Sequence, residues 1–129
     1  MEILIGTAFK QEWIVTEDML AKNMKSGAVS VFATPMMIAM MESAASDCLQ
    51  QFLAPGDISV GTSIATSHLA ATPLGMKVWA VAEITAAEGR RVDFKVTAFD
   101  EVEQIGEGVH SRVFLDGERF EQKAKNKGS

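Results

Sequence analysis

The segment from Ala33 to Ser46 most constrains the fold, because it is a nearly continuous apolar run that begins like a helix. Thr34 can accept a hydrogen bond from the free amides of a first turn, and Pro35 fits the first helical position. The sequence predicts a helix from about Pro35 to Leu53. Its apolar residues are too many for one narrow stripe: Met36, Met37, Met40, Met41, Ala44, Ala45 and Cys48. We therefore expect most of this helix to be covered.

After this helix the apolar residues recur with a period of two, which is typical of strands. Four such stretches, rich in Val, Ile, Thr and Phe, cover Ile58–Thr72, Met76–Ala86, Arg91–Phe99 and Gln104–Leu115. Before the helix, a strand is predicted at Phe9–Thr16 and a short helix at Asp18–Met24.

The connections between the four later strands are short enough for hairpins, so we expect them to form an antiparallel meander in chain order. One apolar helix and about five strands cannot each bury a face alone, and a sheet curled around the helix solves this problem. The sequence therefore predicts an α+β fold in a single domain over residues 1–129.

The overall charge and hydropathy exclude several kinds of partner. A net charge of −5 argues against a nucleic-acid surface, and no run reaches the roughly 18–20 apolar residues of a membrane span. Three lysines near the end, Lys123, Lys125 and Lys127, are expected to be solvated rather than to bind a ligand. Cys48 is the sole cysteine, so no internal disulfide can form, and we expect a cytoplasmic protein.

Glu42 is the only charged residue in the apolar run. An ionised carboxylate in such a setting must accept hydrogen bonds, be neutralised by a raised pKa, or border a wet cleft. The third case is common at sites of chemistry, which makes Glu42 a candidate catalytic residue.

The small residues from Gly61 to Thr72 leave room for a ligand beside the predicted sheet. Within this stretch only His68 can exchange a proton near neutral pH. A histidine on an apolar strand is commonly structural, but the isolated acid Glu42 is its natural partner, so we expect the two to meet beside a cavity. His110 lies next to charged neighbours and is expected at an exposed or rim position.

Other chemistry-bearing patterns are absent from the sequence. Two histidines without ligand-spaced cysteines or carboxylates do not predict a metal site. No nucleophile elbow, phosphate-binding glycine loop or dinucleotide fingerprint occurs. With these patterns absent, we expect a mechanism based on a carboxylate and an imidazole, with no metal and no cofactor.

Several short segments follow one another at consistent spacing: Val31-Phe32-Ala33-Thr34, Glu42, Gly61-Thr62, His68, Ala70-Ala71-Thr72-Pro73, Glu88-Gly89-Arg90-Arg91 and Ile105-Gly106-Glu107-Gly108-Val109-His110-Ser111-Arg112. This order resembles the hotdog-fold thioesterases of the fluoroacetyl-CoA thioesterase type, over about residues 31–120. The resemblance implies a hotdog fold, in which an antiparallel sheet wraps around a long central helix, and an acyl-CoA substrate.

The resemblance also implies a role for individual residues. It places the catalytic set on Thr34, Glu42 and His68, and the contacts to the acyl group on Gly61 and Arg112. The segment from Ile14 to Val31 has no aromatic residue where the fluoroacetyl-CoA-specific enzyme has a phenylalanine-containing lid. The resemblance therefore does not determine which acyl group the protein accepts.

The spacing of Thr34 and Glu42 adds a geometric constraint. Eight helical residues at roughly 1.5 Å each separate them by about 12 Å, which is beyond hydrogen-bond reach. Both can serve one site if they come from different subunits. We therefore expect a twofold homodimer whose two active sites each draw on both chains.

Three functions remain open at this stage. In the first, an acyl-CoA thioesterase, Glu42 activates water or attacks directly, His68 orients Glu42 or moves a proton, and Thr34 binds the reacting group. The second is a non-catalytic module of the same fold that binds an acyl-CoA or another small ligand. The third is hydration or dehydration of an enoyl thioester, which a Glu–His pair fits less well.

Overall fold

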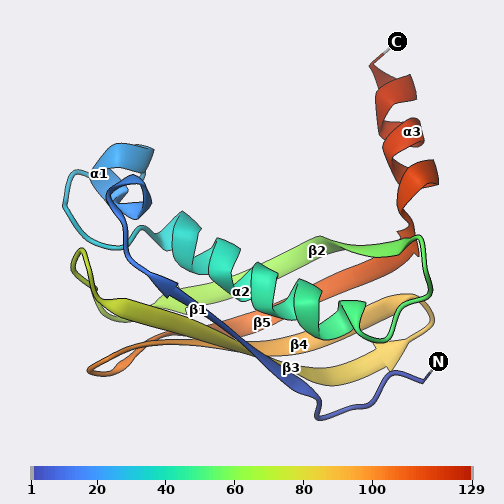
Figure 1. Ribbon diagram of the computed structural model, residues 1–129, viewed down its shortest axis with the longest axis horizontal. Coiled ribbons are helices and arrows are strands. Elements are labelled where there is room, and N and C mark those ends of the chain that lie inside the picture. The colour runs from blue at the N-terminus through green and yellow to red at the C-terminus, as the bar shows by residue number, and fades with distance from the viewer. Residues whose placement is uncertain (1, 129) are drawn as a thin grey trace.

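A long helix lies across one face of a five-stranded antiparallel sheet in the computed structural model, which describes residues 2–128 (Figure 1). The elements in chain order are β1 (Ala8–Ile14), the 3-10 helix η1 (Glu17–Met19), α1 (Ala21–Met24), α2 (Thr34–Gln50), β2 (Asp57–His68), β3 (Lys77–Glu88), β4 (Arg91–Asp100), β5 (Gln104–Asp116) and α3 (Gly117–Lys127). This architecture confirms the predicted α+β fold, with five strands around a central helix.

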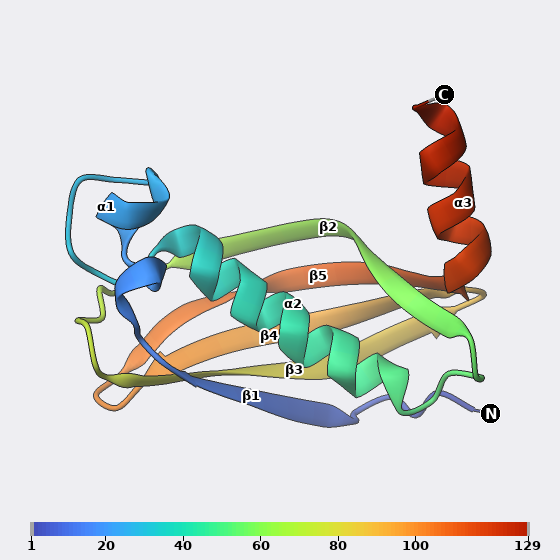
Figure 2. The ribbon, with the colours of Figure 1, turned by 45° about the horizontal axis from the view of Figure 1, so that its top comes forward.

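Helix α2 supplies much of the hydrophobic core. Its buried residues are Met37, Met40, Met41, Ala44, Ala45, Cys48 and Leu49. They pack against alternate residues of the sheet, among them Val78, Ile84 and Phe94. Ile38 and Ala39 stay half-buried, so the chain covers this helix on fewer sides than its composition predicts. Figure 2 shows that α2 lies across the face of the sheet, with β2 along one edge and β1 along the other.

The strand order is β1-β3-β4-β5-β2, so only β3, β4 and β5 form the expected meander. The predicted hairpin between β2 and β3 is wrong, because β2 pairs antiparallel with β5 instead. After β2 the chain crosses the end of the sheet. The Thr72 carbonyl accepts a hydrogen bond from the Phe32 amide at 2.8 Å, and its hydroxyl donates to the buried Asp100 carboxylate at 2.8 Å. These bonds hold the crossing in place.

The C-terminal segment forms the helix α3, where sequence analysis predicts a solvated tail. Asp116 caps this helix, since its carboxylate accepts a hydrogen bond from the Arg119 amide at 2.9 Å. Acidic Glu118 in the first turn and basic Lys125 and Lys127 in the last turn suit the helix dipole. The helix buries none of its residues and stands away from the sheet, beyond the edge strand β2 (Figure 1).

Strand β2 is an edge strand of 12 residues with one side unpaired. A free edge of this length is a ready template for pairing with another strand. Strand β2 is also the element that connects the two halves of the candidate site described below.

Candidate active site

Thr34 and His68 meet at the start of α2. The Thr34 hydroxyl and His68 Nδ1 are 2.7 Å apart, within hydrogen-bond distance. The expectation that Thr34 caps α2 is wrong: Ala33 is the N-cap residue, no side chain caps the helix, and Thr34 is its first residue. The hydroxyl instead lies within hydrogen-bond distance of the His68 imidazole at the end of β2.

The second nitrogen of His68 has no partner of its own. Among residues 2–128, Nε2 of His68 is the one buried side-chain polar atom without a hydrogen bond. Burial lowers the pKa of His68, and the backbone of Ala70 offsets this only in part. His68 is therefore neutral at pH 7, with one nitrogen engaged by Thr34 and the other buried without a hydrogen-bond partner.

A pocket of about 390 Å³ opens beside this pair. Apart from Thr34 and His68 its lining is apolar or small, and includes Ala21, Gly27, Val29, Phe32, Leu69 and Ala70. The wall formed by α1 and the following loop therefore carries no charged side chain. Such a lining suits a short uncharged group next to the Thr34 hydroxyl.

Glu42 lies at a different point along β2, against Gly61. Its Oε2 is 3.0 Å from the position that a Cβ would occupy on Gly61. The Glu42 residue is half-buried, so it borders accessible space, which is the third of the cases expected for an isolated acid. The absence of a side chain at Gly61 is what lets the carboxylate approach the strand so closely.

Two side chains of β5, His110 and Arg112, lie with Glu42 around Gly61. His110 is 2% exposed, so its predicted rim position is wrong. Its Nδ1 donates to the carbonyl of Ser63 at 2.8 Å, which leaves Nε2 as an acceptor for Arg112 Nη1 at 3.2 Å. These two bonds together require the neutral form of His110.

Burial is the largest cause of the lowered pKa of both His110 and Arg112. Burial lowers the pKa of His110, Arg112 lowers it further, and the Ser63 carbonyl and Glu42 offset part of this effect. Arg112 is also fixed by Ser59, whose hydroxyl and carbonyl accept hydrogen bonds at 2.8 and 3.0 Å. The guanidinium is thus held beside Gly61, and Arg112 is a buried residue of an interior strand, not a strand-edge charge.

Sequence analysis missed His110, although a usable signal was present. Residues two apart on a strand share a face, so the candidate contact residue Arg112 implies that His110 faces the helix as well. The charge of Arg112 concealed this, because a charged neighbour suggests an exposed position, whereas Arg112 is itself buried on that face.

Glu42 and His68 do not meet within one chain. The two sit at separate points of α2 and β2, with Thr34 and His68 at one end and Glu42, Gly61, His110 and Arg112 at the other. Gly61 and His68 are seven residues apart on β2, which spans about 23 Å at ~3.3 Å per residue. A single chain therefore holds the candidate residues in two separate clusters.

Comparison with known proteins identifies the family. Residues 15–118 match the fluoroacetyl-CoA-specific thioesterase family. A fluoroacetyl-CoA thioesterase of Streptantibioticus cattleyicolor is 42% identical over 97 residues, which cover 75% of this chain and 70% of that protein. The chain belongs to the fluoroacetyl-CoA-specific thioesterase family.

Solved structures agree with this family. A mutant of the fluoroacetyl-CoA-specific thioesterase FlK, in complex with fluoroacetate and CoA, superposes with a TM-score of 0.86 at 35% identity, over 92% of this chain and 99% of that one. A thioesterase superfamily member from Thermus thermophilus superposes with a TM-score of 0.90 at 31% identity, over 98% and 94% of the two chains. Family membership confirms the expected hotdog fold and the expected enzyme class, a thioesterase.

Two further expectations concern metals and membranes. Among residues 2–128, no group of three or more His, Cys, Asp and Glu side chains is placed to hold a metal ion. Within the same residues, none of the helices has the length and apolar character needed to cross a membrane.

Proposed function

We propose that this member of the thioesterase family hydrolyses small acyl-CoA thioesters to the free acid and CoA, at two sites that are each completed by a second copy of the chain. One observation carries this proposal. The Thr34–His68 pair at 2.7 Å opens onto an apolar pocket, while Glu42, the only charged residue from Ala33 to Ser46, lies on α2 beside Gly61, toward the other end of β2. Neither half suffices for hydrolysis alone.

A twofold axis near the middle of β2 brings the halves together. If the free edges of two β2 strands pair antiparallel about residues 64–65, His68 of one chain lies opposite Gly61 of the other. Residues directly opposite in an antiparallel pair face the same side of the sheet. Both His68 and Gly61 face α2, as their contacts with Thr34 and Glu42 show. Such pairing also covers the free edge and the exposed flank of α2.

Each residue has a role in this shared site. Glu42 activates a water molecule or attacks the thioester carbonyl directly. Neutral His68 moves a proton through its free Nε2, and Thr34 donates a hydrogen bond to the reacting group. The start of α2 places the positive end of the helix dipole beside the Thr34–His68 pair, which stabilises the developing negative charge of the oxyanion. Gly61 and Arg112 contact the acyl group.

The pocket indicates which acyl groups fit. Its volume of about 390 Å³ and its small or apolar lining favour short acyl groups. The reaction as written needs water and no cofactor. A cytoplasmic location agrees with a single, buried and unpaired Cys48.

The test is release of free thiol from a panel of acyl-CoAs of increasing length and polarity. Wild-type protein should turn over short acyl-CoAs, and Glu42→Gln and His68→Ala should each lower kcat by about 10²- to 10⁴-fold. Binding of CoA esters without thiol release would favour a non-catalytic ligand-binding module. Turnover of an enoyl-CoA without thiol release would favour the hydratase reaction.

A further inference from the structure

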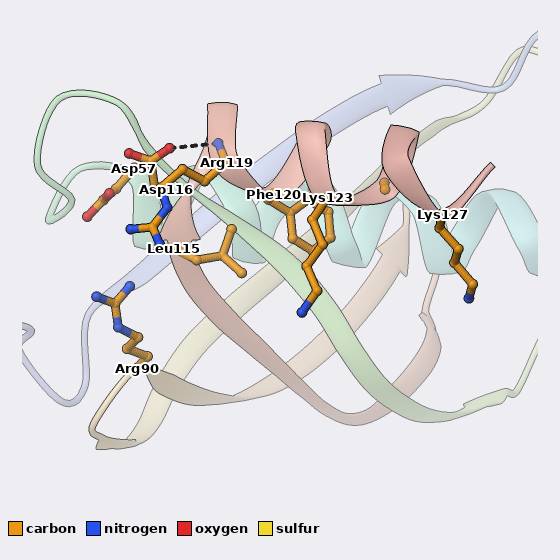
Figure 3. Close-up of a pocket in the computed structure, with 9 residues that line it drawn as sticks. Asp57, Arg90, Leu115, Asp116, Arg119, Phe120, Lys123 and Lys127 are labelled. Atoms are coloured by element: carbon orange, nitrogen blue, oxygen red, sulfur yellow. Dashed lines mark hydrogen bonds between the residues drawn. The ribbon is translucent and has the colours of Figure 1, made fainter. Parts of the chain in front are cut away.

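The groove at the base of α3 gathers cationic side chains on a protein whose net charge is −5. It measures about 1110 Å³, and its lining includes Arg90, Arg119, Lys123 and Lys127. Arg90 comes from the turn between β3 and β4, and the other three come from α3 (Figure 3). Elements distant in the sequence thus direct positive charge into one space.

The three cations on α3 form a row at intervals of four residues, Arg119, Lys123 and Lys127. Like charges at this spacing repel each other and destabilise a helix, unless an anion lies between them. No ion pair found among residues 2–128 involves the side chains of these three residues or of Arg90. The acidic residues of the helix, Glu118 and Glu121, fall outside the groove lining.

Two carboxylates also line the groove, and one of them is already engaged. Asp116 accepts the hydrogen bond from the Arg119 amide that caps α3. Asp57 begins β2 and pairs across the sheet with Asp116. Four cationic side chains against two acidic ones leave the groove positive.

An apolar surface lies between the cations. Leu115 and Phe120 line the groove, and Phe120 is 40% exposed, so its ring is available to a ligand. Figure 3 shows both side chains beside Arg119 and Lys123. An exposed aromatic ring among cations suits a nucleotide, whose base can stack while its phosphates meet positive charge. A small inorganic anion would make no use of the ring.

The groove lies at the Glu42 end of β2. Asp57, in its wall, is four residues from Gly61, about 13 Å along the strand at ~3.3 Å per residue. His68 is eleven residues away, about 36 Å at the same rise. Since the proposed dimer brings His68 of the second copy to Gly61, the groove is adjacent to the completed site and not to the Thr34–His68 pair of its own chain.

We infer that this groove binds the phosphate-bearing nucleotide of the CoA substrate, and thereby positions the thioester at the junction of the two chains. This inference rests on the proposed function. It assigns the acyl group to the pocket of one subunit and the nucleotide to the α3 groove of the other. The nucleotide is remote from the reacting carbonyl, so its contacts are the same in the ground state and the transition state. They therefore act on KM and leave kcat unchanged.

The experiment compares two substrates with the same acyl group, the acyl-CoA and the corresponding acyl-pantetheine, which lacks the nucleotide. The double variant Arg119→Gln/Lys123→Gln should raise KM for the acyl-CoA by about tenfold or more, because charge-assisted contacts to phosphate are lost. Its KM for the acyl-pantetheine should change far less. Added salt should raise the wild-type KM for the acyl-CoA alone.

A matched control lies on the same helix. Lys125→Gln removes the same charge from α3, but Lys125 does not line the groove, so it should leave KM for both substrates near the wild-type value. Charge reversal by Lys123→Glu should exceed the effect of Lys123→Gln. Calorimetry with adenosine 3′,5′-bisphosphate provides a second readout, in which the wild type should bind and the double variant should bind about tenfold more weakly.

The outcomes separate this inference from the proposed function. If the wild type releases thiol from both substrates and the double variant keeps its KM for the acyl-CoA, the groove does not bind the nucleotide. If the double variant changes the molecular mass in solution and not KM, the groove is a contact between copies, which also overturns the inference. If the wild type hydrolyses neither substrate, the proposed function fails, and adenosine 3′,5′-bisphosphate binding still decides the question of the groove.

Discussion

Adding one methyl group at Gly61 tests how closely the catalytic role of Glu42 depends on its position. The new Cβ would lie 3.0 Å from Glu42 Oε2, 3.1 Å from His110 Cε1 and 3.5 Å from Arg112 Nη1. The first two contacts are tighter than ordinary packing, so the side chains must retreat by a few tenths of an ångström. The backbone itself needs no change, because Gly61 has no positive φ.

The expected effect follows from this displacement. Since misplacing a catalytic group by ~1 Å costs about 10²-fold, Gly61→Ala should lower kcat on a short acyl-CoA by about three- to tenfold. In a Glu42→Gln background, Gly61→Ala should cause almost no further loss, because the group it displaces is already inactive. Thiol release under saturating substrate measures both effects.

Stability provides the control for this experiment. Gly61→Ala should change the free energy of unfolding by less than about 1 kcal/mol, since only the ends of side chains must move. Gly108→Ala is the contrasting variant: its Cβ would clash with the Ala65 carbonyl oxygen, a backbone atom, so this substitution should destabilise the protein by about 1–3 kcal/mol or more. Equal losses of kcat from Gly61→Ala in the wild-type and Glu42→Gln backgrounds would refute a role through Glu42.

Three further predictions concern pH and stability. Because burial lowers the pKa of His68, kcat/KM should fall only below about pH 6.5 if neutral His68 accepts the proton; an acid limb with its midpoint above pH 7 would contradict this. The pKa of His110 is also lowered, so the unfolded chain binds more protons than the folded one below about pH 6.5. The free energy of unfolding should therefore decrease from pH 7 to pH 5. Chemical denaturation at pH 7 and pH 5 should show a smaller decrease for His110→Gln than for the wild type. Thr72→Val removes the buried hydrogen bond to Asp100 and should lower the free energy of unfolding by about 1–3 kcal/mol, whereas an unchanged denaturation midpoint would show that the crossing after β2 does not need it.

Local sequence signals predict the elements of this fold better than their arrangement. The Thr34-Pro35 start and the period-two stretches locate α2 and the later strands to within a few residues, except that β2 ends at His68 and not at Thr72. The pairing of β2 with β5 depends on where the chain goes after His68. Hydrogen bonds from Thr72 to residues distant in the sequence decide this, and no periodicity encodes them.

For the candidate site, too, the sequence predicts individual residues better than it predicts how they are arranged in space. Isolation of Glu42 in an apolar run and the small residues around His68 single out both residues from composition alone. Their separation in one chain depends on which residues of α2 lie next to which residues of β2, and only the folded structure determines this alignment. The burial of His110 was not apparent from the sequence, because Arg112, two residues away on the same face of β5, is a charged residue that is itself buried.

Subunit mixing tests most directly whether each active site is completed by two chains. Thr34→Ala and Glu42→Gln proteins, each inactive, are unfolded, mixed in equal amounts and refolded, and thiol release is measured. Half of the dimers formed at random are mixed and each holds one intact site, so about a quarter of wild-type activity should return. Thr34→Ala mixed with His68→Ala should recover nothing, because those two residues serve a site from the same chain. Recovery in the second mixture but not in the first would contradict the split site.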